Sequence, residues 1–401
     1  MDLDLEGIEL MLLIAAVVAV LARRLHLPYT VGLTLAGIAL AFTPVKFDLQ
    51  LTKNLIFSAF LPPLIFETAL NLDWRELRSN GWVVLILVTA GVLIAAGIVA
   101  AGLHVGEAWP WPSAAVLGLL ISATDPVSVI ATFKEAGVTG RLRLLVESES
   151  LFNDGIVAVL YGIALAIATG GGVSVGAAAV DLFRSVAGGI GCGAAAGGLV
   201  LLLAGRTQDR LVEITFSSIA AYGSFFVAEH FHFSGVLATL TAGILIGNTG
   251  NLGAFSDRGR DAVMGFWEYV GFVANSLIFL LIGARLVAQH VLGAAAVASL
   301  TVALVLVGRA VAVYVCCGVF ARTRQRVSAR HQHILVWGGL RGALALELAR
   351  GLPADVPLHS QIVSVAFAVV AFSVLVPGLT MPLLLRRHGE IGEGRDPGAA
   401  G

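Results

Sequence analysis

The stretch Leu144–Leu165, LLVESESLFNDGIVAVLYGIAL, carries three carboxylates inside an otherwise apolar run. About 20 such residues are enough for one helix to cross the hydrocarbon core of a bilayer. A charged side chain at the bilayer centre costs roughly 2.5–3.5 kcal/mol on insertion scales. These acids therefore need a partner cation of the protein, water, or a transported ion beside them.

The polar residues of this stretch fall on two neighbouring faces of the predicted helix. Ser150 and Asp154 are four residues apart and share one face, and Glu149 and Asn153 share the next. A hydroxyl beside a carboxylate suits a small hard cation, whereas Glu149 needs a basic partner from another part of the chain. A soluble loop is the alternative interpretation, and the apolar flanks disfavour it.

The composition of the whole chain indicates an all-α polytopic membrane protein. Of its 401 residues 58% are hydrophobic and 13% are charged, and the mean hydropathy is +0.91; about a quarter of the residues of a soluble domain are charged. A net charge of −1, with arginines spread over short loops, gives no patch for nucleic acid. The three cysteines have neither disulfide nor metal spacing. The acidic N-terminus does not resemble a signal peptide.

About thirteen apolar segments are long enough to cross a bilayer. They cover approximately residues 7–24, 29–43, 53–71, 81–104, 112–133, 144–168, 182–204, 211–230, 233–249, 263–287, 293–320, 332–351 and 360–385. We predict one transmembrane domain over residues 1–385 and a short cytoplasmic tail over 386–401.

Basic residues concentrate in alternate loops, as in Arg23-Arg24 and in the run from Arg322 to Arg330. By the positive-inside rule these loops are cytoplasmic. The pattern predicts a plasma (inner) membrane protein with its N-terminus outside and its C-terminus inside. That orientation requires an odd number of spans, which thirteen satisfies.

Thirteen spans divide into two six-helix units of opposite orientation, about residues 7–168 and 211–385, joined by a Gly-rich connector over 182–204. The fifth span is interrupted at Thr124-Asp125-Pro126 and the twelfth at Gly338–Gly342. Interrupted spans at corresponding places of two inverted halves indicate the midplane site of a transporter. No repeat is visible residue by residue, so the symmetry rests on topology.

The interruption of the fifth span offers ligands. Pro126 has no N–H, so the carbonyl of Ser122 loses its helical partner. Freed carbonyls at membrane depth are tolerated only beside protein or water. Asp125 and Thr124 add a carboxylate and a hydroxyl at the same point. A kink without a ligand role is the alternative, and the adjacent Asp favours a functional site.

Two further features leave alternatives open. Glu67, in LPPLIFETAL, either faces the same cavity or lies near the cytoplasmic headgroups. His331 and His333, beside Arg330, either sense pH or sit at a charged interface, and we favour the interface.

Arg341 in the twelfth span is an intramembrane guanidinium that does not deprotonate. It needs an acid beside it, and we favour Glu149, with Glu147 and Glu347 as alternatives. Arg309, in the eleventh span, is a weaker candidate that we expect to extend toward the headgroups.

Three motifs carry a resemblance to a known family. SATDPVSV (Ser122–Val129), ESLFND (Glu149–Asp154) and GGLRGALAL (Gly338–Leu346) closely resemble motifs of the monovalent cation:proton antiporters, in the sodium/proton exchanger (NhaP-like) branch. They occur in the family's order, and the apolar layout is similar over about residues 8–385.

The resemblance implies roles for these residues. Asp154 would bind cation and proton in turn, Asn153 would stabilise the crossing of the two interrupted helices, and Glu149 and Arg341 would form a structural ion pair. The residues that would complete the surroundings of the transported monovalent cation are Asp125, Thr124, Ser150 and Glu67. Pro126 would support the site through the break it makes.

The resemblance further implies a homodimer in which a core domain, holding crossed discontinuous helices, moves against a dimerisation domain. The order Asn153-Asp154 resembles the electroneutral branch. The predicted function is exchange of Na⁺ (or Li⁺) for H⁺ by alternating access, without a cofactor and without enzyme activity. K⁺/H⁺ exchange, a cation channel, and an intramembrane aspartyl protease using Asp125 and Asp154 are the alternatives. A channel needs a continuous pore, which one buried cluster does not suggest.

Overall fold

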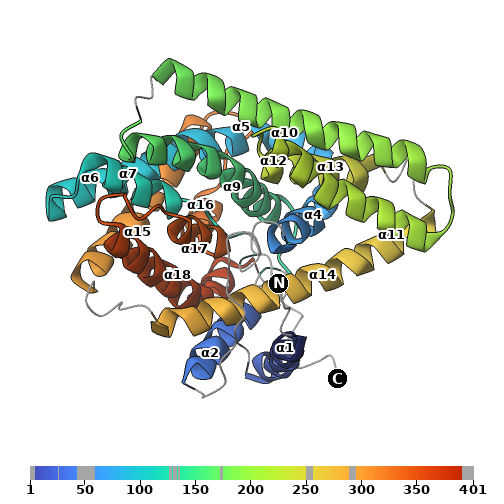
Figure 1. Cartoon of the computed structure of the whole chain (residues 1–401), viewed down its shortest axis with the longest axis horizontal. Coiled ribbons are helices and arrows are strands. Elements are labelled where there is room, and N and C mark those ends of the chain that lie inside the picture. Colours follow the sequence, from blue (N-terminus) through green and yellow to red (C-terminus); the bar gives the residue numbers. More distant parts are fainter. Residues whose placement is uncertain are drawn as a thin grey trace.

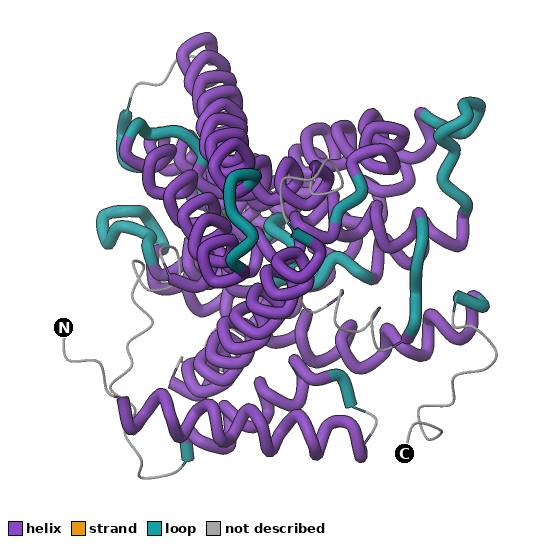
Figure 2. The backbone as a smooth tube through the Cα atoms, turned by 90° about the vertical axis from the view of Figure 1, so that its right-hand side faces the viewer, coloured by secondary structure: helices purple, strands orange, loops and turns teal. Residues whose placement is uncertain are grey.

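A computed structural model of the chain describes residues 5–25, 27–42, 59–125, 129, 133, 136–171, 175–249, 256–288 and 295–390. Within these ranges the backbone consists of helices and loops without a strand (Figure 2). Seven helices of this part are long and apolar enough to cross a membrane, and three shorter apolar helices accompany them. The prediction of an all-α polytopic membrane protein is confirmed. The count of about thirteen spans stays a prediction.

The helices follow the predicted spans closely. Those of the first part are α1 (Leu5–Leu25), α2 (Tyr29–Ala41), α4 (Leu61–Asn71), α5 (Trp74–Ile86), α6 (Val92–Glu107), α7 (Trp111–Leu120), α9 (Arg141–Ala168) and α10 (Val175–Ala204). Those of the second part are α11 (Arg210–Ser218), α12 (Ser224–His230), α13 (Gly235–Thr249), α14 (Asp257–Ala288), α15 (Ala295–Val319), α16 (Ala329–Trp337), α17 (Ala343–Arg350) and α18 (His359–His388). Five-residue π-helical segments join α5 to α6 and α11 to α12.

One group of helices, which we call the scaffold, consists of α1, α2, α4 and α10–α14. The long helix α14 crosses the lower half of the view in Figure 1 and packs against α2, α4 and α11. A Cβ on Gly37 of α2 would lie 2.1 Å from the carbonyl oxygen of Leu280, and one on Gly283 of α14 would lie 2.1 Å from that of Thr34. Glycine at both positions lets the two backbones approach closely, as is common between membrane helices.

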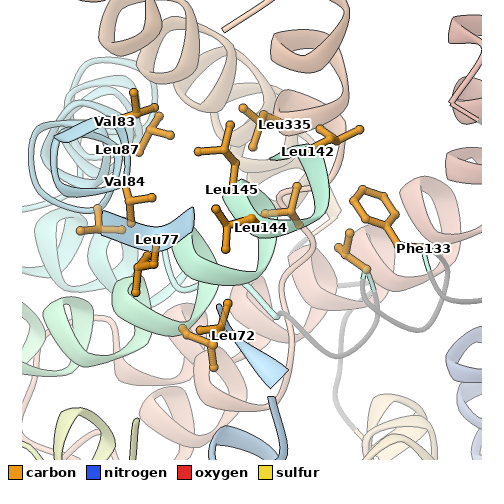
Figure 3. Close-up of a cluster of buried hydrophobic side chains, with 14 of the residues drawn as sticks. Leu72, Leu77, Val83, Val84, Leu87, Phe133, Leu142, Leu144, Leu145 and Leu335 are labelled. Atoms are coloured by element: carbon orange, nitrogen blue, oxygen red, sulfur yellow. The ribbon is translucent and has the colours of Figure 1, made fainter. Parts of the chain in front are cut away.

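The second group, which we call the core, consists of α5–α7, α9 and α15–α18. In it α6 packs on α7 and α15, α7 on α9, and α15 and α17 on α18. Figure 3 shows part of its interior, where side chains of α5 face those of α9 and α16. The labelled residues of these three helices are Leu77, Val83, Val84, Leu142, Leu144, Leu145 and Leu335. This packing holds α9, with its acidic residues, inside the core.

Two helices of the core are interrupted where the sequence predicts it. The helix α7 ends at Leu120, and residues 123–125 are not helical. Likewise α16 ends at Trp337, residues 339–342 are not helical, and α17 begins at Ala343. Pro126 lies outside the described residues. The inverted relationship of the two halves stays a prediction.

Candidate ion-binding site

The two interruptions meet through the backbone. The amide of Asp125 donates a hydrogen bond of 2.7 Å to the carbonyl oxygen of Leu340, and the amide of Arg341 donates one of 2.6 Å to Ser373 Oγ on α18. Backbone groups that leave a helix inside the membrane must find such partners. The two unwound segments therefore satisfy part of each other's hydrogen bonding and fix their mutual position.

The carbonyl of Ser122 is the one that the sequence predicts to lack a helical hydrogen-bond partner. In the structure it accepts hydrogen bonds from two side chains. Asn153 Nδ2 of α9 donates to it at 2.9 Å, and Arg341 Nη1 donates at 2.9 Å. Arg341 Nη1 also lies 3.4 Å from the carbonyl oxygen of Ala123. Both carbonyls lie just beyond the C-terminal end of α7, where the helix dipole is negative, so a guanidinium is favourable there.

The hydroxyl groups of the site are joined to the same network. Thr124 Oγ1 donates to Ser150 Oγ at 3.1 Å, and Asn153 Nδ2 lies 3.1 Å from Thr124 Oγ1. All three side chains are buried. The structure thus brings the predicted residues Thr124, Ser150 and Asn153 together at the break of α7.

Two carboxylates complete this cluster. Asp125 and Asp154 are 8% and 4% exposed, and both line a cavity of about 30 Å³ together with Thr124 and Gly342. Such a volume exceeds the about 10–15 Å³ that a single water needs. Asp154 Oδ1 has no hydrogen-bond partner among the described residues. A buried carboxylate oxygen beside a small cavity is available to a cation or a proton.

Gly342 sets the shape of this cavity. A Cβ at this position would lie 2.4 Å from Asp125 Cβ, closer than non-bonded carbons approach each other. Glycine is therefore required for the second interruption to pass beside the carboxylate of the first.

The structure does not bring Glu67 into this cluster. The cavity is lined on the α4 side by Leu61, Leu64 and Ile65, and Glu67 is not among the described residues that line it. Its side chain packs on α14, because a Cβ on Gly271 would lie 3.4 Å from Glu67 Cγ. Its predicted contribution to the cation's surroundings has no support in this arrangement.

The predicted ion pair of Glu149 with Arg341 is wrong, because Glu149 pairs with Arg309 of α15. Both Glu149 oxygens accept from this guanidinium, Nη1 to Oε1 and Nη2 to Oε2 at 2.6 Å. Arg309 also donates to the carbonyl oxygen of Leu335, from Nε at 3.2 Å and from Nη2 at 2.9 Å. Arg309 is buried and does not extend toward the headgroups. The bidentate geometry is what a guanidinium offers a carboxylate.

The physical reason for this correction is that Arg341 has a different set of partners. Its guanidinium is held by the carbonyls at the end of α7. Glu147, one of the alternatives, is bound by Arg143 one turn earlier on α9 at 2.5 Å. Glu347, the other, is buried on α17. The sequence pattern favoured Arg341 over Arg309 as the partner of Glu149, and the packing of the helices reverses that choice.

His331 and His333 lie where the C-terminal end of α18 meets α15 and α16. His331 Nε2 is 3.2 Å from a Glu390 carboxylate oxygen, and His333 Nδ1 is 2.6 Å from Tyr314 Oη. The ring of His333 also stacks on that of His388. The two histidines thus join three segments of the chain at one interface.

The fold and the site together define a class of protein. A helical membrane protein whose two interrupted helices meet at buried carboxylates has the architecture of a secondary transporter. The chain belongs to the sodium/hydrogen exchanger family, because residues 11–387 match the family described as "Sodium/hydrogen exchanger, transmembrane".

Individual relatives agree with this assignment. The chain is 34% identical over 371 residues to the Na(+)/H(+) antiporter ApNhaP of Aphanothece halophytica. This alignment covers 92% of this chain and 71% of that protein. It is 34% identical to the Na(+)/H(+) antiporter NhaH of Halobacillus dabanensis, with 96% and 98% covered. Its fold is similar to that of the sodium proton antiporter MjNhaP1 from Methanocaldococcus jannaschii, with a TM-score of 0.79 at 18% identity, covering 96% and 98% of the chains.

Proposed function

We propose that this chain exchanges Na⁺ (or Li⁺) for H⁺ across the membrane. The observation that carries the proposal is the small buried cavity lined by Asp125 and Asp154 where the two interrupted helices meet. The family and the names of the relatives support the same exchange. A single cavity of about 30 Å³ suits an occluded ion better than the continuous pore of a channel.

Asp154 is the group for which Na⁺ and H⁺ compete. Its Oδ1 atom is buried without a hydrogen-bond donor among the described residues, so the carboxylate depends on the transported ion for neutralisation. Asp125 and Thr124 supply further oxygens at the cavity, and Ser150 orients the Thr124 hydroxyl. Oxygen ligands of this kind suit a small hard cation.

Coupling follows from the cost of a charge inside the membrane. A core that carries an unneutralised carboxylate crosses the low-dielectric region at a high cost, whereas one that carries Na⁺ or H⁺ does not. The core helices would move against the scaffold between the two access states. One site that binds either ion gives electroneutral exchange.

The remaining assignments follow the sequence pattern. Arginines in alternate loops support an N-terminus outside and a C-terminus in the cytoplasm of the plasma (inner) membrane. A homodimer formed through the scaffold, and a role in pH homeostasis, are part of the same proposal.

The test is a proteoliposome assay with a trapped pH dye. Addition of Na⁺, Li⁺ or K⁺ to the wild type should move protons rapidly, and the series of ions identifies the substrate. Asp154→Asn should abolish cation-driven proton movement, since the amide has no charge for which the two ions compete.

Asp181→Asn is the matched control, because Asp181 is an exposed carboxylate on α10, far along the chain from the interrupted helices. It should exchange like the wild type. Exchange by Asp154→Asn at the wild-type rate would overturn the assignment of the site, and proton flux that does not saturate with cation would favour a channel.

A further inference from the structure

A large groove lies between the core and the scaffold, away from the ion cavity. It has a volume of about 730 Å³ and runs between α5 and α9 of the core and α10 and α13 of the scaffold. Its walls are mostly apolar, with Leu85 on α5, Val88 in the π-helical segment after it, Phe152 on α9, Ile190 on α10 and Leu245 on α13. The volume is within the range that drug-sized ligands occupy in proteins.

One end of this groove is polar and positively charged. Trp74 and Arg78 line it there, near the first residue of α5, and Trp82 follows one turn later. The two tryptophans are 50% and 65% exposed, and tryptophan is enriched where membrane meets water. Arg78 is exposed, and its side chain makes no hydrogen bond or ion pair with any described residue. None of the described residues that line the groove is acidic.

The dimensions of the groove match one leaflet of a bilayer. From Trp74 to Val88, the wall formed by α5 and the start of the π-helical segment after it is about 21 Å long at about 1.5 Å per residue. Half of the hydrocarbon core is about 15 Å thick. In the proposed orientation the first turn of α5 lies at the cytoplasmic surface. The charged end is therefore at headgroup height, and the apolar part extends toward the bilayer centre.

We propose that this groove binds one anionic phospholipid of the cytoplasmic leaflet. An acyl chain lies between α5, α10 and α13, and the phosphate and its headgroup lie against Arg78. Arg78 has no partner, and the groove has no acidic wall residue, within the described part of the chain. This favours a lipid with a net negative charge over one whose headgroup also carries an ammonium. The site is distinct from the ion cavity, so its occupation does not depend on the proposed exchange.

Gly81 provides a sharp test of the acyl-chain position. It lines the groove in the middle of α5, and a Cβ added to it would meet nothing within 4 Å. The Cβ of Gly81→Leu therefore has room, and the leucine side chain takes up space within the groove. Gly97 on α6 is the matched control. It is also helical, a Cβ there would also meet nothing within 4 Å, and it does not line the groove.

The experiment uses the full chain in detergent and a phosphatidylglycerol analogue with a photoreactive group on its acyl chain. In the wild type, labelled peptides should come from α5, α10 and α13. Unlabelled phosphatidylglycerol should compete about fivefold better than phosphatidylcholine, the preference expected for one arginine near the surface. Arg78→Gln should remove this preference, Gly81→Leu should abolish labelling of the groove, and Gly97→Leu should behave like the wild type.

Other outcomes overturn the proposal. Equal competition by the two lipids in the wild type, or an unchanged preference in Arg78→Gln, contradicts the headgroup assignment. Labelling that persists in Gly81→Leu contradicts the position of the acyl chain. If the wild type shows no labelling in the groove and Gly81→Leu changes the oligomeric state, a second copy of the chain fills the groove instead. Because the readout is lipid labelling, its failure is distinguishable from a failure of Asp154 in the exchange assay.

Discussion

The backbone amide of Asp125 donates a 2.7 Å hydrogen bond to the carbonyl oxygen of Leu340, so the two interrupted helices are joined at the residue that carries one of the site's carboxylates. Two residues beyond Leu340, Gly342 passes so close to Asp125 that a Cβ would lie 2.4 Å from Asp125 Cβ. The position of this carboxylate therefore depends on the path of the second interruption.

Gly342→Ala should strongly reduce exchange, because the added methyl group displaces either Asp125 or the segment that contains Leu340. Overpacking of this kind costs about 1–3 kcal/mol. Thermal unfolding in detergent should show this loss, and the proteoliposome assay should show the loss of exchange. Gly97→Ala, whose new Cβ would meet nothing within 4 Å, should leave both unchanged. Normal exchange by Gly342→Ala would mean that this approach is not needed for ion binding.

The ion pair of Glu149 with Arg309 should stabilise the core only as a pair. Either Glu149→Gln or Arg309→Met leaves one buried charge without its partner, which costs about 3–5 kcal/mol. The double variant should recover much of this loss, since it buries neither charge. Unfolding temperatures of the four proteins provide the double-mutant cycle.

The same cycle with Arg341→Met in place of Arg309→Met is the control. Arg341 donates to backbone carbonyls of Ser122 and Ala123, so its substitution should couple to Glu149→Gln much more weakly than Arg309→Met does. Strong coupling between Glu149 and Arg341, with none to Arg309, would contradict the pairing in the structure.

Sequence alone predicted the features that depend on local chemistry. The apolar spans, the break before Pro126 and the break at Gly338–Gly342 follow from hydropathy and backbone geometry, and the structure has both interruptions at these places. The freed carbonyl of Ser122 also follows from Pro126, and in the structure it accepts hydrogen bonds from Asn153 and Arg341.

Features that depend on which helices pack together could not be predicted in the same way. The sequence predicts that the buried carboxylate of Glu149 has a basic partner. Whether that partner is Arg309 or Arg341 depends on the position of α15 beside α9 and α16. The side of α4 that faces the cavity also comes from packing: Ile65 lines it and Glu67 does not. The groove beside α5 is lined by helices that lie between residues 74 and 249 of the chain, so no single stretch indicates it.

The contact of His331 with Glu390 should have little effect on exchange. Their side chains are 23% and 24% exposed, and a pair this close to water is worth about 0–1 kcal/mol. His331→Ala and Glu390→Gln should therefore lower stability slightly and leave the pH dependence of exchange unchanged. A displaced pH profile in both variants would instead identify this pair as a pH sensor.

Competition of Na⁺ and H⁺ for Asp154 gives exchange a defined pH dependence. Only the ionised carboxylate binds Na⁺, so protons that occupy the site raise the apparent KM for Na⁺ as the pH falls. Once the carboxylate is mostly protonated, the rise should approach about tenfold per pH unit, as linkage of one proton requires. Saturating Na⁺ displaces the proton from the side at which Na⁺ binds, so the maximal rate should change much less than KM over the same range.

Initial rates in proteoliposomes, measured against Na⁺ concentration at several pH values that are equal on both sides, separate the maximal rate from KM. The contrary outcome is a maximal rate that decreases as the pH is lowered, at a constant KM for Na⁺. The inhibitory proton would then bind a group other than the one that binds Na⁺, and Asp154 could not be the shared site.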